Sequence, residues 1–167
     1  MGYDFTFARA EDAQRLLPEL FAILHGNMSR IAPTGGSYEE DCALWTSYML
    51  PALREGKCRV VLLREGDELI GYFQYSISDG VLLMEEVQLK LHRQGTGVFR
   101  ALFVWLVCTL PEGIEWVEAY ARKENAKSQA VLGHMGLSCI GENKSGSSLR
   151  FRGRYADLAR LYAADAK

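Results

Sequence analysis

The chain has 167 residues, of which 49% are hydrophobic and 24% are charged, and its formal net charge is −2 at pH 7. This composition excludes an intrinsically disordered chain, and the length fits a single domain over residues 1–167 with a core of its own. The near-neutral charge argues against a general nucleic-acid-binding protein, which usually carries a clear basic excess.

Apolar periodicity predicts one strand and two helices in the first third of the chain. Ser37 is followed three residues later by Glu40, which matches a capping box and marks the start of the second helix. The expected elements are a strand over residues 3–7, a helix over 11–25, a loop over 26–37 and a helix over about 38–56.

The rest of the chain alternates strands with helices. The expected strands cover residues 59–64, 68–78, 81–89, 113–121, 137–141 and 147–152, and the expected helices cover residues 96–108, 125–135 and 155–163. This order predicts an α/β fold with a mixed central sheet of about seven strands and helices on both faces.

The cysteines and the apolar runs bear on the cellular compartment. Four cysteines stand far apart without zinc-site spacing, so we expect a reduced, cytoplasmic protein that holds no metal. The longest unbroken apolar run, residues 101–108, is far shorter than the roughly 20 residues that span a bilayer. We therefore expect neither a membrane partner nor a nucleic-acid partner.

A turn with two glycines, Gly95 and Gly97, joins the strand that ends near residue 89 to the following helix. Glycine lets backbone N–H groups approach an anion without a Cβ in the way, and a helix N-terminus adds further donors. The turn therefore suits a pyrophosphate. It is not a P-loop, because no Lys-Ser/Thr follows the second glycine, and the third glycine of the dinucleotide fingerprint is also absent.

This turn resembles motif A of the GNAT superfamily of acyl-CoA N-acyltransferases, which reads Gln/Arg-x-x-Gly-x-Gly/Ala. Gly95 and Gly97 match its two small positions, and His92 occupies the Gln/Arg position. The order of the expected elements over nearly the whole chain is also similar to that of the family.

A second segment is similar to the family motif Asn-x-x-Ala-x-x-Leu-Tyr-x-x-x-Gly-Phe. Asn125, Ser128 and Gly136 fit it, whereas Leu132 stands at the tyrosine position. In many members that tyrosine protonates the leaving thiolate, so the departure leaves the general acid open.

The resemblance implies that acetyl-CoA is the cosubstrate and that it lies where the fourth and fifth strands separate. It implies no metal. The residues expected to contact the cosubstrate are Val87, His92, Arg93, Gln94, Gly95, Thr96, Gly97, Val98, Asn125 and Ser128.

Two adjacent carboxylates, Glu85 and Glu86, interrupt an otherwise apolar strand. Strand alternation places them on opposite faces unless a bulge intervenes, so at least one should be partly buried and suited to act as a general base. Glu86 is slightly preferred. Tyr120, at the end of the fifth strand, is a candidate acid in place of the missing family tyrosine.

These observations predict an N-acetyltransferase that moves an acetyl group from acetyl-CoA directly to a primary amine of a small molecule. A protein N-terminal or lysine acetyltransferase is one alternative. The other alternative is a CoA-binding module of the same fold without catalysis, which is consistent with Leu132 at the position of the family's tyrosine. A homodimer stays open.

Overall fold

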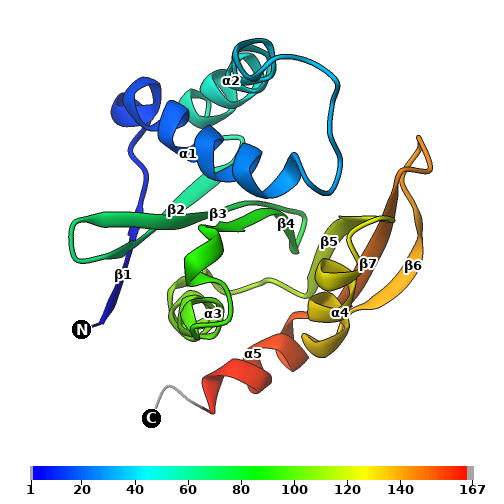
Figure 1. The fold of residues 1–167 in the computed structure, drawn as a ribbon. Coiled ribbons are helices and arrows are strands. Elements are labelled where there is room, and N and C mark those ends of the chain that lie inside the picture. The colour runs from blue at the N-terminus through cyan, green and yellow to red at the C-terminus, as the bar shows by residue number, and fades with distance from the viewer. Residues whose placement is uncertain (1, 165–167) are drawn as a thin grey trace. The chain divides into compact units, whose positions relative to one another are not determined.

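The computed structural model describes residues 2–164 (Figure 1). The chain divides into two units: residues up to Gln74 together with Glu86–Val98, and Tyr75–Glu85 together with the residues from Phe99 onward. The expectation of a single domain stays a prediction.

Seven strands and five α-helices, with two short 3₁₀ turns, make up the described residues. The strands are β1 (Tyr3–Phe7), β2 (Arg59–Glu65), β3 (Glu68–Ser78), β4 (Val81–Leu89), β5 (Trp116–Arg122), β6 (Ser138–Glu142) and β7 (Ser148–Arg154). The helices are α1 (Ala13–Met28), α2 (Tyr38–Arg54), α3 (Val98–Thr109), α4 (Ala126–His134) and α5 (Tyr155–Ala163), and the 3₁₀ turns are η1 (Ala10–Asp12) and η2 (Leu91–Arg93).

The strands form one mixed sheet in the order β1-β2-β3-β4-β5-β7-β6. β1 pairs with β2, and β7 pairs with both β5 and β6, in antiparallel fashion, whereas β4 and β5 are parallel. The predicted fold class, a mixed α/β fold with about seven strands, is therefore confirmed.

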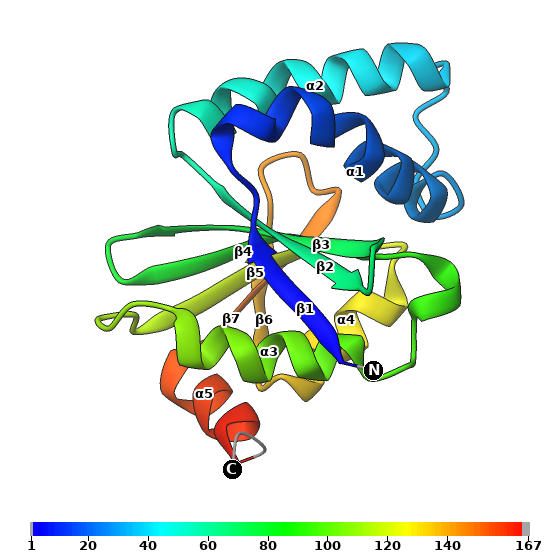
Figure 2. The ribbon, with the colours of Figure 1, turned by 90° about the vertical axis from the view of Figure 1, so that its left-hand side faces the viewer.

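In the first unit, α1 and α2 lie side by side next to the strands (Figures 1 and 2). The apolar stripe of α1, including Leu16 and Leu20, packs with Met49 of α2 and Val60 of β2 in one buried cluster. Each fully buried side chain of this size contributes about 1.5–3 kcal/mol. The Ser37–Glu40 capping box forms as predicted and starts α2.

In the second unit, α4 and α5 contact the β5–β7 pair (Figure 2). Val117 and Ala119 of β5 are buried, and so is Phe151 of β7. The ring of Phe103 in α3 lies 5.2 Å from that of Tyr162 in α5, which joins these two helices.

Several element boundaries differ from the sequence expectation by one to three residues. α1 continues through Gly26 to Met28, although residues 26–37 were expected to be a loop. α3 begins at Val98 rather than at residue 96, because Gly95 and Gly97 both adopt positive φ, which an α-helix does not allow. β5 begins only at Trp116.

Within residues 2–164, no helix combines the length and the apolar character that a bilayer crossing requires.

Candidate functional site

The two glycines of the turn before α3 create open space in front of the backbone. Gly95 has φ +76° and Gly97 has φ +88°, values that side-chain-bearing residues rarely adopt. A Cβ added at either position would meet no heavy atom within 4 Å. Backbone N–H groups of residues 95–98 can therefore be approached by a large anion, and the turn fits a phosphate group.

Two hydrogen bonds to carbonyl oxygens of this turn hold it in place. The Thr96 hydroxyl donates to the Arg93 carbonyl at 2.7 Å, and the Tyr3 hydroxyl of β1 donates to the Thr96 carbonyl at 3.0 Å. Both bonds use carbonyl oxygens and engage no N–H group of residues 95–98, whereas the Gln94 N–H donates to the Leu91 carbonyl at 3.2 Å.

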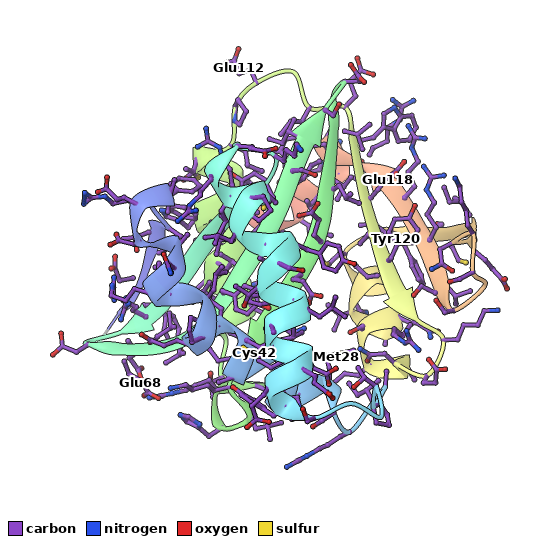
Figure 3. All side chains as sticks on the ribbon, turned by 90° about the horizontal axis from the view of Figure 1, so that it is seen from above. Met28, Cys42, Glu68, Glu112, Glu118 and Tyr120 are labelled. Carbon is purple, nitrogen blue, oxygen red and sulfur yellow. The ribbon has the colours of Figure 1, made fainter. Side chains whose placement is uncertain are left out.

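The basic side chains just before the glycines are paired with carboxylates of the β2–β3 hairpin. Arg93 contacts both Glu65 and Glu68, the latter at 3.3 Å, while Lys90 and His92 reach Glu68 at 3.0 and 3.5 Å (Figure 3 labels Glu68). Hydrogen bonds from Lys90 and Arg93 lower the pKa of Glu68. We therefore assign these side chains to fixing the turn on the hairpin; the predicted contacts of His92 and Arg93 with the cosubstrate stay predictions.

An amide network joins α1 to the end of β4. Asn27 Nδ2 donates to Gln88 Oε1 and to the Leu89 carbonyl, both at 2.9 Å. Gln94 Nε2 donates to the same Leu89 carbonyl at 3.2 Å and to Asn27 Oδ1 at 3.4 Å. The contact with β4 explains why the helix continues through Gly26: it places Asn27 against the strand.

The same network extends to Glu86. Gln88 is buried, and its Nε2 donates to Glu86 Oε2 at 2.7 Å. Tyr72 of β3 is fully buried, and both desolvation and the charge of Glu86 raise its pKa well above the ordinary value. Glu86 is therefore a half-buried carboxylate held by an amide donor, as a positioned base requires.

Glu85 lies in a different environment. It is exposed, and it accepts a hydrogen bond from the Ser76 hydroxyl of β3 at 3.3 Å. Of the two candidate bases, Glu86 has the burial that the chemistry favours, which keeps it preferred.

The ladder between β4 and β5 is short. It runs from Val81↔Trp116 to Met84↔Ala119, although β4 continues to Leu89. Val87 is half-buried and lies in the part of β4 beyond this ladder.

The second motif forms the start of α4. Asn125 is the N-cap, and its side-chain oxygen accepts from the Ser128 N–H at 3.1 Å. The two residues contact each other and shape the helix N-terminus; their predicted contact with the cosubstrate stays a prediction. Leu132 is buried, 8% exposed, and packs within the second unit.

Tyr120 lies on β5 (Figure 3) and is 45% exposed, and it stands opposite Arg150 of β7 in the register of the two strands. Glu118, two residues earlier, is buried and paired with the Arg150 guanidinium at 2.8 Å. Tyr120 is thus accessible to a ligand, which a proton donor must be.

Sequence reasoning did not identify Glu68 and Gln88 as part of this region. Glu68 follows a hairpin turn and reads as an ordinary surface carboxylate. Gln88 was detectable as a polar residue on the same strand face as Glu86, two positions away. The contacts of Asn27 could not be predicted locally, because its partners Gln88 and Leu89 lie more than 60 residues along the chain.

Comparison by sequence gives no relative: no family model and no curated protein matches the chain. Comparison by structure does. The PaiA N-acetyltransferase of Thermoplasma acidophilum, solved with coenzyme A, superposes with a TM-score of 0.73 at 15% identity, over 93% of this chain and 100% of that one.

Two further structures agree. A GNAT-family acetyltransferase of Bacillus cereus has a TM-score of 0.60 at 17% identity, over 92% of this chain and 98% of its own. The spermidine/spermine N-acetyltransferase SpeG of Vibrio cholerae has a TM-score of 0.62 at 13% identity, over 95% and 97% of the two chains. This chain therefore has the fold of the GNAT acetyltransferases, as its two motifs predicted.

Proposed function

We propose that the protein is an N-acetyltransferase that moves an acetyl group from acetyl-CoA directly to the primary amine of a small molecule. The observation that carries this proposal is the turn at Gly95 and Gly97, whose two positive-φ glycines leave the backbone open to a phosphate within a GNAT fold. The turn would hold the pyrophosphate through backbone N–H groups of residues 95–98.

The pantetheine arm of acetyl-CoA is an extended chain with amide groups. The part of β4 beyond Met84, where the ladder with β5 ends, offers backbone groups to such a chain. Val87 lies in this stretch, and a backbone N–H there would polarise the thioester carbonyl.

Glu86 is the proposed base. A primary amine with a pKa near 10 is mostly protonated at pH 7, so it must lose a proton before it can attack. Glu86 accepts that proton, directly or through a water; the amine nitrogen then bonds to the thioester carbon and the C–S bond breaks. The products are the N-acetyl amine and the CoA thiolate.

The thiolate then takes a proton. Leu132 has no proton to give, and a thiol of ordinary pKa near 8.5 leaves without strong need for an acid. Tyr120, whose hydroxyl is on an exposed side chain, is the proposed donor, with water as the substitute.

The test combines binding with turnover. Calorimetry should give saturable acetyl-CoA binding to the wild-type chain, and a thiol assay should show CoA release that depends on added primary amine. Binding without amine-dependent release from any amine in a broad library would contradict the transferase proposal.

A second candidate function rests on Leu132. If the chain is a CoA-binding module without catalysis, acetyl-CoA should bind and stay intact. Leu132→Tyr restores the family residue, and amine-dependent turnover that appears only in this variant would support the module. Turnover already present in the wild type would exclude it.

A further inference from the structure

One face of the β5–β7 pair carries an unusual set of side chains. In the antiparallel register, Trp116 stands opposite Arg154, Glu118 opposite Arg152, and Tyr120 opposite Arg150. Directly opposed residues share a face of the sheet. We call this set the arginine face, and its members are Trp116, Glu118, Tyr120, Arg150, Arg152 and Arg154.

The alternate residues point the other way and are apolar. Val117, Ala119 and Phe151 are buried, and α4 and α5 contact these two strands. The helices therefore account for one face of the strand pair, and the arginine face is the opposite one.

Arg150 and Arg152 pair with the same carboxylate, that of Glu118. The side chain of Glu118 is 10% exposed, and both of its oxygens accept hydrogen bonds from the Arg150 guanidinium. Nη2 lies 2.8 Å from Oε1, and Nε lies 3.3 Å from Oε2. Arg152 Nη1 is 3.4 Å from Glu118 Oε1. Three guanidinium groups against one carboxylate leave a surplus of two positive charges.

Arg152 and Arg154 also flank one indole ring. Their guanidinium carbons lie 4.2 and 3.9 Å from the centroid of Trp116. Cation–π contact holds a guanidinium plane without neutralising its charge or using all its N–H donors. Among residues 2–164, Arg154 has no carboxylate partner, and Arg152 Nε is buried without a hydrogen-bond partner.

We propose that the arginine face binds an oxyanion, a carboxylate or a phosphate, carried by the acceptor amine. Two forks pre-oriented on an indole ring match the two oxygens of a carboxylate or two of the three terminal oxygens of a phosphate. The inference rests on the proposed function, because it places the amine end of the acceptor near Tyr120. The acceptor is then an amine with an acid group at its other end, and not a polyamine.

The register sets the backbone spacing between those two ends. Strands advance about 3.3 Å per residue, so the Cα atoms of Arg152 and Arg154 lie about 7 and about 13 Å along the strands from the level of Tyr120, and both guanidinium groups contact Trp116. An α-amino acid is too short to bridge the shorter of these spans. An amino acid with a longer chain between amine and acid, such as 6-aminohexanoate, spans it.

The experiment compares acceptors of matched length. Acetyl-CoA-dependent thiol release is measured with 6-aminohexanoate, 5-aminopentyl phosphate, 1-aminohexane and 1,5-diaminopentane. We expect KM for the two anionic amines to be about tenfold or more below that for the diamine, and to rise with added salt, which screens exposed charges. A lower KM for the diamine would overturn the proposal.

Variants separate the face from general effects of charge. Arg154→Gln, which breaks no ion pair, should raise KM for the anionic amines about fivefold to tenfold, with 1-aminohexane and acetyl-CoA unchanged. Arg152→Lys keeps the charge but loses the fork and should give a smaller rise. Arg160→Gln on α5 removes the same charge from an exposed pair with Asp157 and serves as the control.

A binding measurement keeps the two proposals distinguishable. NMR titration of the acetyl-CoA-saturated protein with 6-aminohexanoate and 1-aminohexane reports on the face without any turnover. Preferential binding of 6-aminohexanoate that Arg154→Gln abolishes supports the arginine face, even if no amine is acetylated and the transferase proposal fails. Equal binding of the two amines overturns the arginine face, even if transfer occurs.

Discussion

The basic residues of the two units are neutralised to different degrees. In the first unit, Lys90, His92 and Arg93 share the two carboxylates Glu65 and Glu68 at the edge of the glycine turn. On the arginine face of the second unit, Glu118 pairs with Arg150 and Arg152, and the Trp116 ring contacts the guanidinium groups of Arg152 and Arg154.

This difference separates positioning from charge recognition. Paired cations fix a backbone but offer little attraction to a further anion, so under the proposed function the turn would bind its phosphate through N–H groups and the space at Gly97. Arginines held by an aromatic ring keep their charge and can attract a ligand. The first unit should therefore set cosubstrate affinity and proton removal, and the second should set the choice of acceptor.

The largest effect is expected for the base. Glu86→Gln keeps the shape of the side chain but cannot accept a proton, so the rate near pH 7 should fall about 10²–10⁴-fold, with acetyl-CoA affinity nearly unchanged. Steady-state kinetics and calorimetry measure the two quantities.

Two comparisons decide where proton transfer resides. Glu85→Gln tests whether the exposed neighbour is the base instead. If Glu85→Gln loses activity while Glu86→Gln stays active, the base is Glu85. Tyr120→Phe removes only a hydroxyl, and a larger loss than in Glu86→Gln would move the dominant proton transfer to the second unit.

The next effect concerns the carboxylate on which the arginine face depends. Glu118→Gln leaves the Arg150 fork without a charged partner, so the free energy of unfolding should fall by about 1–3 kcal/mol. Urea unfolding measures this. Asp157→Asn breaks an exposed pair with Arg160 and should change stability by less than about 0.5 kcal/mol. Equal losses in the two variants would show that Glu118 is an ordinary surface partner.

The glycine turn gives the third prediction. Gly97→Val places a side chain into the open space and strains the backbone at φ +88°, so acetyl-CoA affinity should fall at least about tenfold, or 1.4 kcal/mol. Gly113→Val is matched, since Gly113 has φ +90° and the same open space in another turn. Loss of affinity in both variants would point to global strain, and unchanged affinity in folded Gly97→Val would remove the turn from the site.

Local patterns explain why most elements could be predicted. The strands over residues 68–78 and 81–89, and the helix over 155–163, match to the residue, because alternation, a two-residue turn and helical spacing are all short-range signals. The Ser37–Glu40 capping box is likewise local.

The site was less predictable, because its partners are distant in sequence. Arg150, Arg152 and Arg154 alternate visibly along the chain, but their relation to Glu118 and Trp116 depends on a register between strands 32 residues apart. The same holds for α1, whose end depends on the contact of Asn27 with Leu89 of β4. Glycine at position 26 alone predicts a break there.

That contact gives the fourth prediction. Asn27→Asp keeps the acceptor for Gln94 but loses the donor to Gln88 and to the Leu89 carbonyl. A neutral hydrogen bond is worth about 0.5–1.5 kcal/mol, so KM for acetyl-CoA should rise about twofold to tenfold. Ser29→Ala, an exposed change at the end of the same helix, is the control. A change in stability without a change in KM would give Asn27 a purely structural role.

The smallest expected effect is the pH dependence of the ion pairs at Glu68. Its pKa is lowered from the ordinary 4.5 by hydrogen bonds from Lys90 and Arg93, so the folded protein favours the charged carboxylate. The pairs therefore stabilise the fold above pH 4.5, and this contribution disappears as the pH falls through the lowered value. Because the side chain is 39% exposed, the effect at neutral pH should be small and should shrink in salt. Urea unfolding of wild type and Glu68→Gln from pH 7 to pH 3 measures it: the two stabilities should converge as the pH falls. A difference that stays constant across this range would mean that Glu68 acts through packing rather than charge, and the contrast with the arginine face would then lose its electrostatic basis.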